Sequence, residues 1–158
     1  MSMTDLSNPA ERAAGRAGIE KLLPHRDPFL FVDCIDITDD EKVIARHVFA
    51  ADEFFFKGHF PVYPVVPGVV LVETMAQAGG AGLAKRGIMG EEALFFLASV
   101  DKVKFRRQVR PDEEVRLEIT NLRVSAKMIK QSGKAFVGDE LAAEAEWLCL
   151  VGSKDDVK

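Results

Sequence analysis

The second half of the chain alternates between apolar and polar residues over long stretches, which is typical of strands with one buried face. The segments that predict strands are residues 94–100, 102–106, 114–120, 123–130 and 134–151. We expect the last two to be joined across Gln131, Ser132 and Gly133, because polar residues and glycine are typical of turns.

The first half contains two shorter strand signals. Residues 29–37 and 43–49 are rich in β-branched and aromatic residues, so both predict strands. Prolines interrupt the stretch that follows, and we therefore expect residues 50–67 to be irregular.

Residues 69–84 predict one helix that is apolar or small on every side. A helix of this kind is buried all round, and its many glycines and alanines let other backbone approach closely. Pro67 is tolerated in a first helical turn. Lys85 and Arg86 suit the negative end of the helix, and Gly87 supplies the stop.

Together these elements predict an α+β fold in which an antiparallel sheet wraps around one long buried helix. The sheet covers the helix only partly, so a second subunit is the simplest cover for the remaining side. We expect a single domain over residues 19–152, between a flexible N-terminal tail at 1–18 and a C-terminal tail at 153–158. A short helix is expected near residues 19–23.

Composition and charge narrow the class of protein. Hydrophobic residues make up 47% of the chain, which suits a globular domain. The formal net charge of −4 argues against nucleic acid as the partner. Cys34 and Cys149 form no disulfide framework, so we expect a reducing, cytoplasmic setting. We expect no signal peptide, and the prolines and glycines of the apolar stretch argue against a membrane span.

One acidic residue stands alone in that apolar stretch. Glu73 is the only charged residue between Phe60 and Ala84, and His59 lies just before the stretch. A carboxylate in such surroundings is costly to bury without a partner. One imidazole and one poorly solvated carboxyl group are the components of general acid–base chemistry. These two residues are our candidate catalytic pair.

A long motif surrounds the pair: GHFP at residues 58–61, PVVPGV at 64–69, Glu73, and AQ at 76–77. Further segments of the same pattern are LLPHRDPF at residues 22–29, DKVKF at 101–105 and AAEAE at 142–146. In these segments the chain resembles the 3-hydroxyacyl-acyl-carrier-protein dehydratases, which are hot-dog-fold enzymes of type II fatty acid synthesis. The resemblance covers roughly residues 20 to 150.

The resemblance implies a reaction. Members of the family remove water from a (3R)-hydroxyacyl chain on acyl carrier protein to give the trans-2-enoyl product, without a cofactor. It implies that His59 takes the proton beside the thioester carbonyl, and that Glu73 protonates or orients the departing hydroxyl. Glutamate rather than aspartate at position 73 resembles the branch that dehydrates without moving the double bond. In the family the two residues of one site come from different subunits, which implies a homodimer unit, with a trimer of dimers as one candidate assembly.

Three further residues have candidate supporting roles. Gly68 opens the helix, where unpaired N–H groups could stabilise the thioester oxygen, although a plain turn glycine is the alternative. Gln77 lies one helical turn after Glu73, so it either bonds this carboxyl group or caps a neighbouring strand. Val66 stands where many family members have methionine or phenylalanine, which affects the expected chain-length preference.

Positive charge gathers on one predicted strand. Lys102, Lys104 and Arg106 alternate with apolar residues and so share one strand face. Such a face is usually only solvated, but it could also dock an acidic carrier protein in spite of the net negative charge.

Other functions stay open at this level. A hot-dog acyl thioesterase or enoyl-CoA hydratase would not need the long proline–glycine motif, and a non-catalytic acyl-binding subunit would not need the intact pair. His25 and His47 receive no role, because a structural histidine is the more common case in a turn or a strand. The spacing of the three histidines does not suggest a metal site.

Overall fold

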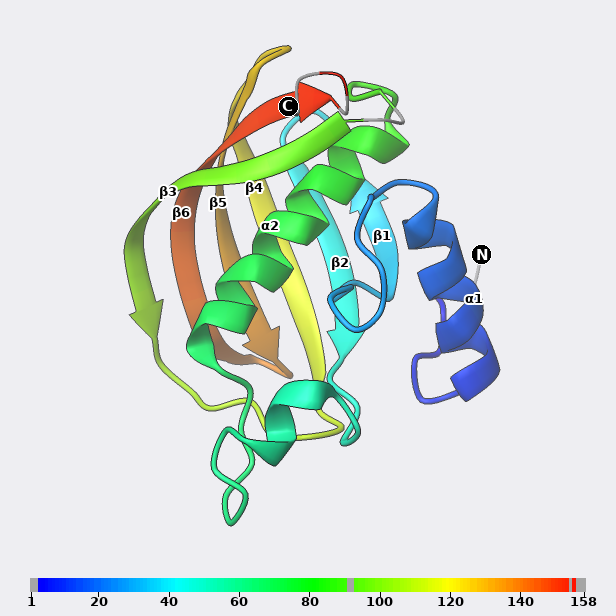
Figure 1. Ribbon diagram of the computed structural model, residues 1–158, viewed down its shortest axis with the longest axis vertical. Coiled ribbons are helices and arrows are strands. Elements are labelled where there is room, and N and C mark those ends of the chain that lie inside the picture. The colour runs from blue at the N-terminus through cyan, green and yellow to red at the C-terminus, as the bar shows by residue number, and fades with distance from the viewer. Residues whose placement is uncertain (1–2, 91–92, 154, 156–158) are drawn as a thin grey trace.

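Six antiparallel strands and one long helix form the α+β core of the protein, shown in Figure 1. The computed structural model describes residues 3–90, 93–153 and 155. Its elements in chain order are α1 (Pro9–Glu20), β1 (Cys34–Thr38), β2 (Lys42–Val48), the short 3₁₀ helix η1 (Phe54–Lys57), α2 (Gly68–Lys85), β3 (Ala93–Phe105), β4 (Glu114–Val124), β5 (Met128–Val137) and β6 (Glu140–Ser153).

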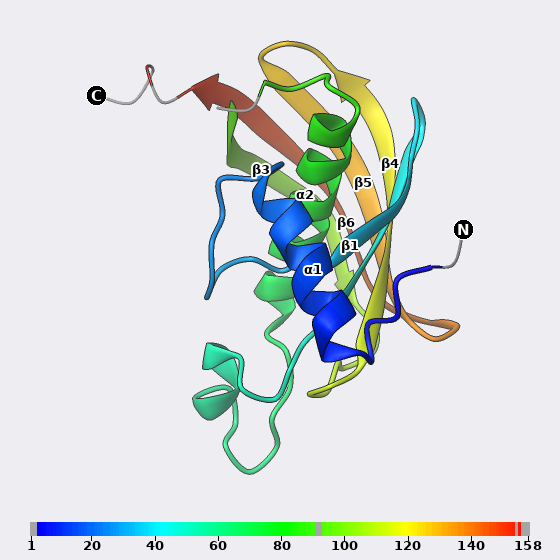
Figure 2. The ribbon, with the colours of Figure 1, turned by 90° about the vertical axis from the view of Figure 1, so that its right-hand side faces the viewer.

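The sheet has the strand order β1-β2-β4-β5-β6-β3, and every neighbouring pair is antiparallel. The strands curve around α2, which crosses one face of the sheet (Figure 1 and Figure 2). The alternation of apolar and polar residues along a strand determines which side chains are buried on this face. In β4, Val115, Leu117 and Ile119 are buried, whereas the residues between them are less buried. The prediction of an antiparallel sheet wrapped around one helix is therefore confirmed.

Helix α2 packs closely on the sheet because its residues are small. It begins one residue before the predicted segment and ends one residue after it. A Cβ added at Gly82 would lie 2.3 Å from Cγ2 of Val43 in β2, so a side chain there would collide with the sheet. Gly87 follows the helix with a φ of +75°, a conformation that favours glycine.

The predicted turn at residues 131–133 is wrong, because these residues lie inside β5. The chain turns instead between β5 and β6, where Gly138 has a φ of +58°. Gly133 is a packing residue, since an added Cβ would lie 2.6 Å from the Trp147 ring. Gln131 is buried and accepts a hydrogen bond from Trp147 Nε1 at 3.2 Å. The strands expected at 123–130 and 134–151 are accordingly replaced by β5 and β6.

The helix of the N-terminal segment also differs from the prediction. Instead of a loose stretch and a short helix near 19–23, α1 begins at Pro9, and the Asn8 side chain caps it by accepting from the Ala10 N–H at 2.9 Å. Leu6, which precedes α1, and Ile19 in its last turn are buried. The division into domain and tails stays a prediction, and most of the expected tail at 153–158 lies outside the described residues.

Two strand predictions differ from the structure in extent. The strand expected at 29–37 begins only at Cys34. The signals at 94–100 and 102–106 belong to one strand, β3, whose register shifts between Asp101 and Lys104 at a bulge. Lys102 lies in this bulge and has a φ of +53°.

Candidate active site

His59 lies just after η1, in a segment that fixes both its backbone and its ring. Its N–H donates to the Phe55 carbonyl at 2.8 Å. Its Nδ1 lies 2.9 Å from the Val65 carbonyl oxygen. A carbonyl oxygen only accepts hydrogen bonds, so Nδ1 of the neutral ring carries the proton. Nε2 is then left with a lone pair, which is what a general base needs.

The residue after His59 has a strained backbone. Phe60 has a φ of +62°, which is unusual for a bulky side chain. Its ring lies 4.3 Å from the imidazole, centroid to centroid, with a tilt of 35°. Strain of this kind persists only where the surroundings hold it, and it is common at functional sites.

A cavity of about 580 Å³ joins His59 to the start of α2. Gly68, the first residue of the helix, lines it together with Val66 and Phe105. Pro67, the N-cap residue, offers no side-chain hydrogen bond, so the first N–H groups of α2 have no side-chain cap. A Cβ at Gly68 would lie 2.8 Å from the Phe105 ring, which gives this glycine a packing reason as well.

Glu73 lies on α2, and Gln77 holds it. Gln77 Nε2 donates to Glu73 Oε1 at 2.9 Å and to the Phe29 carbonyl at 3.1 Å. The Oε1 atom of Gln77 accepts from the Phe31 N–H at 2.8 Å. Gln77 therefore does both things that the sequence left open: it bonds the carboxyl group and it caps the neighbouring segment. Phe29 and Phe31 bond to Gln77, and pairing with β2 starts only at the Asp33 N–H, which donates to the Arg46 carbonyl at 2.9 Å; β1 therefore starts late.

His25 is a neighbour of Glu73 that the sequence analysis left without a role. Its Nε2 lies 3.6 Å from Glu73 Oε1. Both residues line a small cavity of about 40 Å³, together with Gln77 and Phe95. Burial lowers the pKa of His25, although the Glu73 charge acts in the opposite direction. The one signal in the sequence was its place in the LLPHRDPF segment of the family pattern.

The two members of the candidate pair line different cavities of the single chain. His59, Val66 and Gly68 line the larger cavity, whereas Glu73 and Gln77 line the smaller one, and no residue lines both. The Glu73 side chain is 25% exposed in the single chain. In one chain, the candidate base His59 and the candidate acid Glu73 therefore lie in separate cavities.

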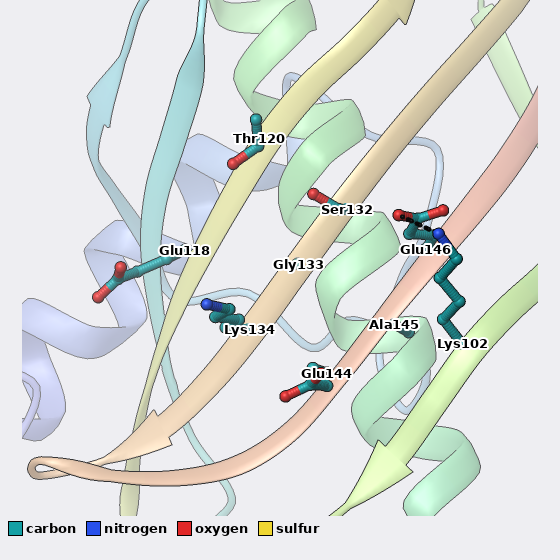
Figure 3. A pocket seen from close by; sticks show the side chains of 9 residues that line it. All are labelled: Lys102, Glu118, Thr120, Ser132, Gly133, Lys134, Glu144, Ala145 and Glu146. Carbon is teal, nitrogen blue, oxygen red and sulfur yellow. Dashed lines mark ion pairs between the residues drawn. The ribbon is translucent and has the colours of Figure 1, made fainter.

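The candidate docking residues carry acidic neighbours. Lys102 lines a pocket of about 340 Å³ on the sheet face opposite α2, and its Nζ lies 3.5 Å from Glu146 Oε1 (Figure 3). The Nε of Arg106 lies 3.1 Å from Glu144 Oε2. Arg106 and Arg107 also line the His59 cavity, and Arg107 is paired with Glu113 and Glu140.

Two other kinds of site are not found in the part of the chain that the structure describes. Residues 3–90, 93–153 and 155 contain no group of three or more side chains that could hold a metal ion. No helix within the same ranges has the length and apolar character that a bilayer crossing needs.

The fold and the sequence have counterparts among known proteins. A solved structure of the dehydratase heterocomplex ApeI:P from Xenorhabdus doucetiae superposes with a TM-score of 0.74 at 17% identity, covering 87% of this chain and 93% of that one. This likeness confirms the hot-dog fold. A family model described as the FabA-like domain matches residues 23–146, which include His59, Gly68 and Glu73.

Close relatives identify the family. The 3-hydroxyacyl-[acyl-carrier-protein] dehydratase FabZ of Desulforamulus reducens is 44% identical over 138 residues, covering 86% of this chain and 96% of the relative. The FabZ of Koribacter versatilis is 44% identical over 134 residues, covering 84% of this chain and 86% of the relative. The chain belongs to the 3-hydroxyacyl-[acyl-carrier-protein] dehydratase family.

Proposed function

We propose that this protein converts (3R)-hydroxyacyl-acyl-carrier-protein to trans-2-enoyl-acyl-carrier-protein in type II fatty acid synthesis. The observation that carries the proposal is the hydrogen bond from His59 Nδ1 to the Val65 carbonyl, which leaves Nε2 available as a base beside the start of α2. The relatives named FabZ act on acyl chains held by acyl carrier protein, as their name states.

In this reaction one C–H bond and one C–O bond break. Nε2 of His59 takes the proton from the carbon beside the thioester carbonyl. The developing enolate oxygen is stabilised by the Gly68 N–H at the positive end of α2. The 3-hydroxyl leaves with a proton from Glu73, so the products are water and the trans double bond. Gln77 holds the Glu73 carboxyl group in place, and Val66 shapes the wall of the cavity.

The site is shared between two subunits in this proposal. Support comes from the separate cavities and from large apolar side chains that the single chain leaves exposed. Val62, in the loop that projects from the end of the molecule (Figure 2), is 98% exposed, and Val69 in the first turn of α2 is 76% exposed. The edge strand β3 adds Phe96 and Phe105, which are each more than half exposed. Pairing of two β3 edges would cover such residues and remove an open sheet edge. The basic unit is then a homodimer, and a trimer of dimers is its candidate assembly.

The carrier protein docks beside the His59 cavity in this proposal. Lys102, Lys104 and Arg106 are the proposed docking residues; Arg106 lines the cavity wall together with Arg107, whereas Lys102 lines the pocket on the sheet face opposite α2. Opposite charge there would steer an acidic carrier toward the site in spite of the net charge of −4. The buried, unpaired thiols of Cys34 and Cys149 fit a cytoplasmic location.

The direct test is to incubate the protein with a 3-hydroxyacyl-acyl-carrier-protein and to follow the absorbance of the enoyl thioester. We expect enoyl formation with the carrier-bound substrate. Release of a free thiol would instead indicate a thioesterase, and equal turnover of the coenzyme A thioester would indicate a coenzyme A hydratase. Binding of the acyl carrier without turnover would indicate a non-catalytic subunit and would refute the proposal.

A further inference from the structure

A fully buried histidine outside the proposed reaction lies between two carboxylates. His47 is on β2; its Nδ1 is 3.1 Å from Asp33 Oδ2, and its Nε2 is 3.2 Å from Glu53 Oε1. Asp33 is fully buried as well, accepts a hydrogen bond from the Val48 N–H at 2.7 Å, and lies 3.5 Å from Arg16 of α1. The charged groups around the ring are therefore Asp33, which precedes β1, and Glu53, which precedes η1. Arg16 of α1 contacts the ring's partner Asp33 rather than the ring itself.

The ring needs two N–H groups to interact favourably with both carboxylates, although the contact between Nδ1 and Asp33, at 3.1 Å, has the distance but not the geometry of a hydrogen bond. A neutral imidazole has one N–H and one lone pair, so it would leave one carboxylate facing a lone pair. The other oxygen of Glu53, Oε2, is buried and has no hydrogen-bond partner among the described residues. Desolvation lowers the pKa of His47, but the hydrogen bonds and charges of Asp33 and Glu53 outweigh this effect, and the pKa is raised. The cluster is therefore built for an imidazolium.

Glu53 connects this ring to the segment that holds His59. Glu53 is the N-cap residue of η1, and the His59 N–H bonds to the carbonyl of Phe55 within η1. The Phe55 ring packs against Phe49 with centroids 6.0 Å apart, and Phe49 meets the His47 ring edge to face at 4.5 Å. An ionic contact and an aromatic contact thus both lead from His47 to the single helical turn before His59.

We propose that protonated His47 is a positioning residue of this enzyme, because it tethers Glu53 and thereby the η1 segment that places His59. The proposal rests on the dehydratase function proposed above. Since the pKa of His47 is raised in the folded protein, the stabilising charge is fully present below the ordinary histidine value and is lost as pH rises through the folded value. Turnover therefore falls on the alkaline side, because the neutral ring leaves one of its two carboxylates facing a lone pair and the cluster that anchors η1 is weakened.

The first test follows the tether in the intact wild-type protein, without substrate. The imidazole of His47 is titrated by NMR, and hydrogen-exchange protection factors are measured for the amides of residues 55–59 over the same pH range. We expect His47 to titrate above the ordinary value of about 6.5, with protection falling over the same interval. A neutral His47 ring at pH 7 would overturn the proposal. Protection factors that stay constant while His47 titrates would overturn it as well. Absence of dehydration at every pH would refute the proposed function alone, because this measurement needs no turnover.

The second test uses His47→Asn and Glu53→Gln, with Asp52→Asn as the matched control. Asp52 is an exposed carboxylate next in sequence to Glu53, and no hydrogen bond or ion pair links it to His47. We expect the two tether variants to lower kcat by roughly tenfold or more, because a displacement of about 1 Å can cost about 10²-fold. KM should change little, and the alkaline decline of kcat should disappear, whereas Asp52→Asn keeps both. If His47→Asn does not fold, Glu53→Gln decides, and a wild-type kcat and pH profile in that folded variant would refute the tether.

Discussion

The Val65 carbonyl oxygen, 2.9 Å from His59 Nδ1, determines which nitrogen of that ring is free. Replacing His59 with alanine removes the base but little packing, because the ring is only partly buried. We expect turnover to fall by roughly 10²- to 10⁴-fold, the usual contribution of a general base, with an unchanged melting curve. Near-wild-type turnover in the folded variant would remove His59 from the mechanism.

Glu73 differs from His59 because a neighbouring side chain already bonds it. In Glu73→Gln the amide oxygen can still accept from Gln77 Nε2, so we expect the fold to persist. Most activity should be lost, since an amide N–H is far too weak an acid to protonate the departing hydroxyl. Turnover is measured beside the melting temperature. Unchanged turnover would leave Glu73 with a structural role only.

Much of the site could be predicted at this scale, because the motif is contiguous from His59 to Gln77. Glu73 and Gln77 lie one turn apart on the same helix, so their hydrogen bond could also be predicted. His25 could not be placed, because its nearness to Glu73 depends on a contact across 48 positions of the chain. Glu53 is only six positions from His47, but the two residues lie on different elements, so no periodic pattern indicated their contact.

At the scale of elements, the glycines of α2 differ in what surrounds them. A Cβ at Gly82 would meet Val43 at 2.3 Å, whereas a Cβ at Gly80 would have its nearest contact, Phe95, at an ordinary 3.4 Å. We expect Gly82→Ala to lower the free energy of unfolding by roughly 1–3 kcal/mol through overpacking. Gly80→Ala, its matched control, should raise it by up to about 1 kcal/mol through helix propensity. Denaturant unfolding of both variants measures these changes, and a Gly82→Ala variant as stable as wild type would contradict the packing account.

The same close packing explains where element prediction failed. Periodicity located α2 and β4 well, because each buries one continuous face or surface. Gly133 was assigned to a turn because glycine beside polar residues is typical of turns. Nothing in the sequence indicates that the Trp147 ring packs over it. The strand boundary near Cys34 was missed because Gln77 satisfies the backbone of the preceding segment, which only the tertiary structure reveals.

At the scale of the whole molecule, His59 and Glu73 line separate cavities, so we expect the proposed chemistry to use two chains. Light scattering at assay concentration should accordingly give a dimer or a multiple of it. The edge position of β3, with its exposed phenylalanines, is the physical reason. A monomer that dehydrates its substrate would contradict this arrangement.

The most direct measurement mixes the two inactive proteins, His59→Ala and Glu73→Gln, under conditions in which exchange of labelled subunits is demonstrated. A mixed dimer then holds one site with both native groups and one site with neither. The account predicts that enoyl formation from 3-hydroxyacyl-acyl-carrier-protein returns on mixing, toward about one quarter of the wild-type rate at equal amounts, since half of the randomly exchanged dimers are mixed and each has one intact site. No recovery despite complete subunit exchange would contradict it.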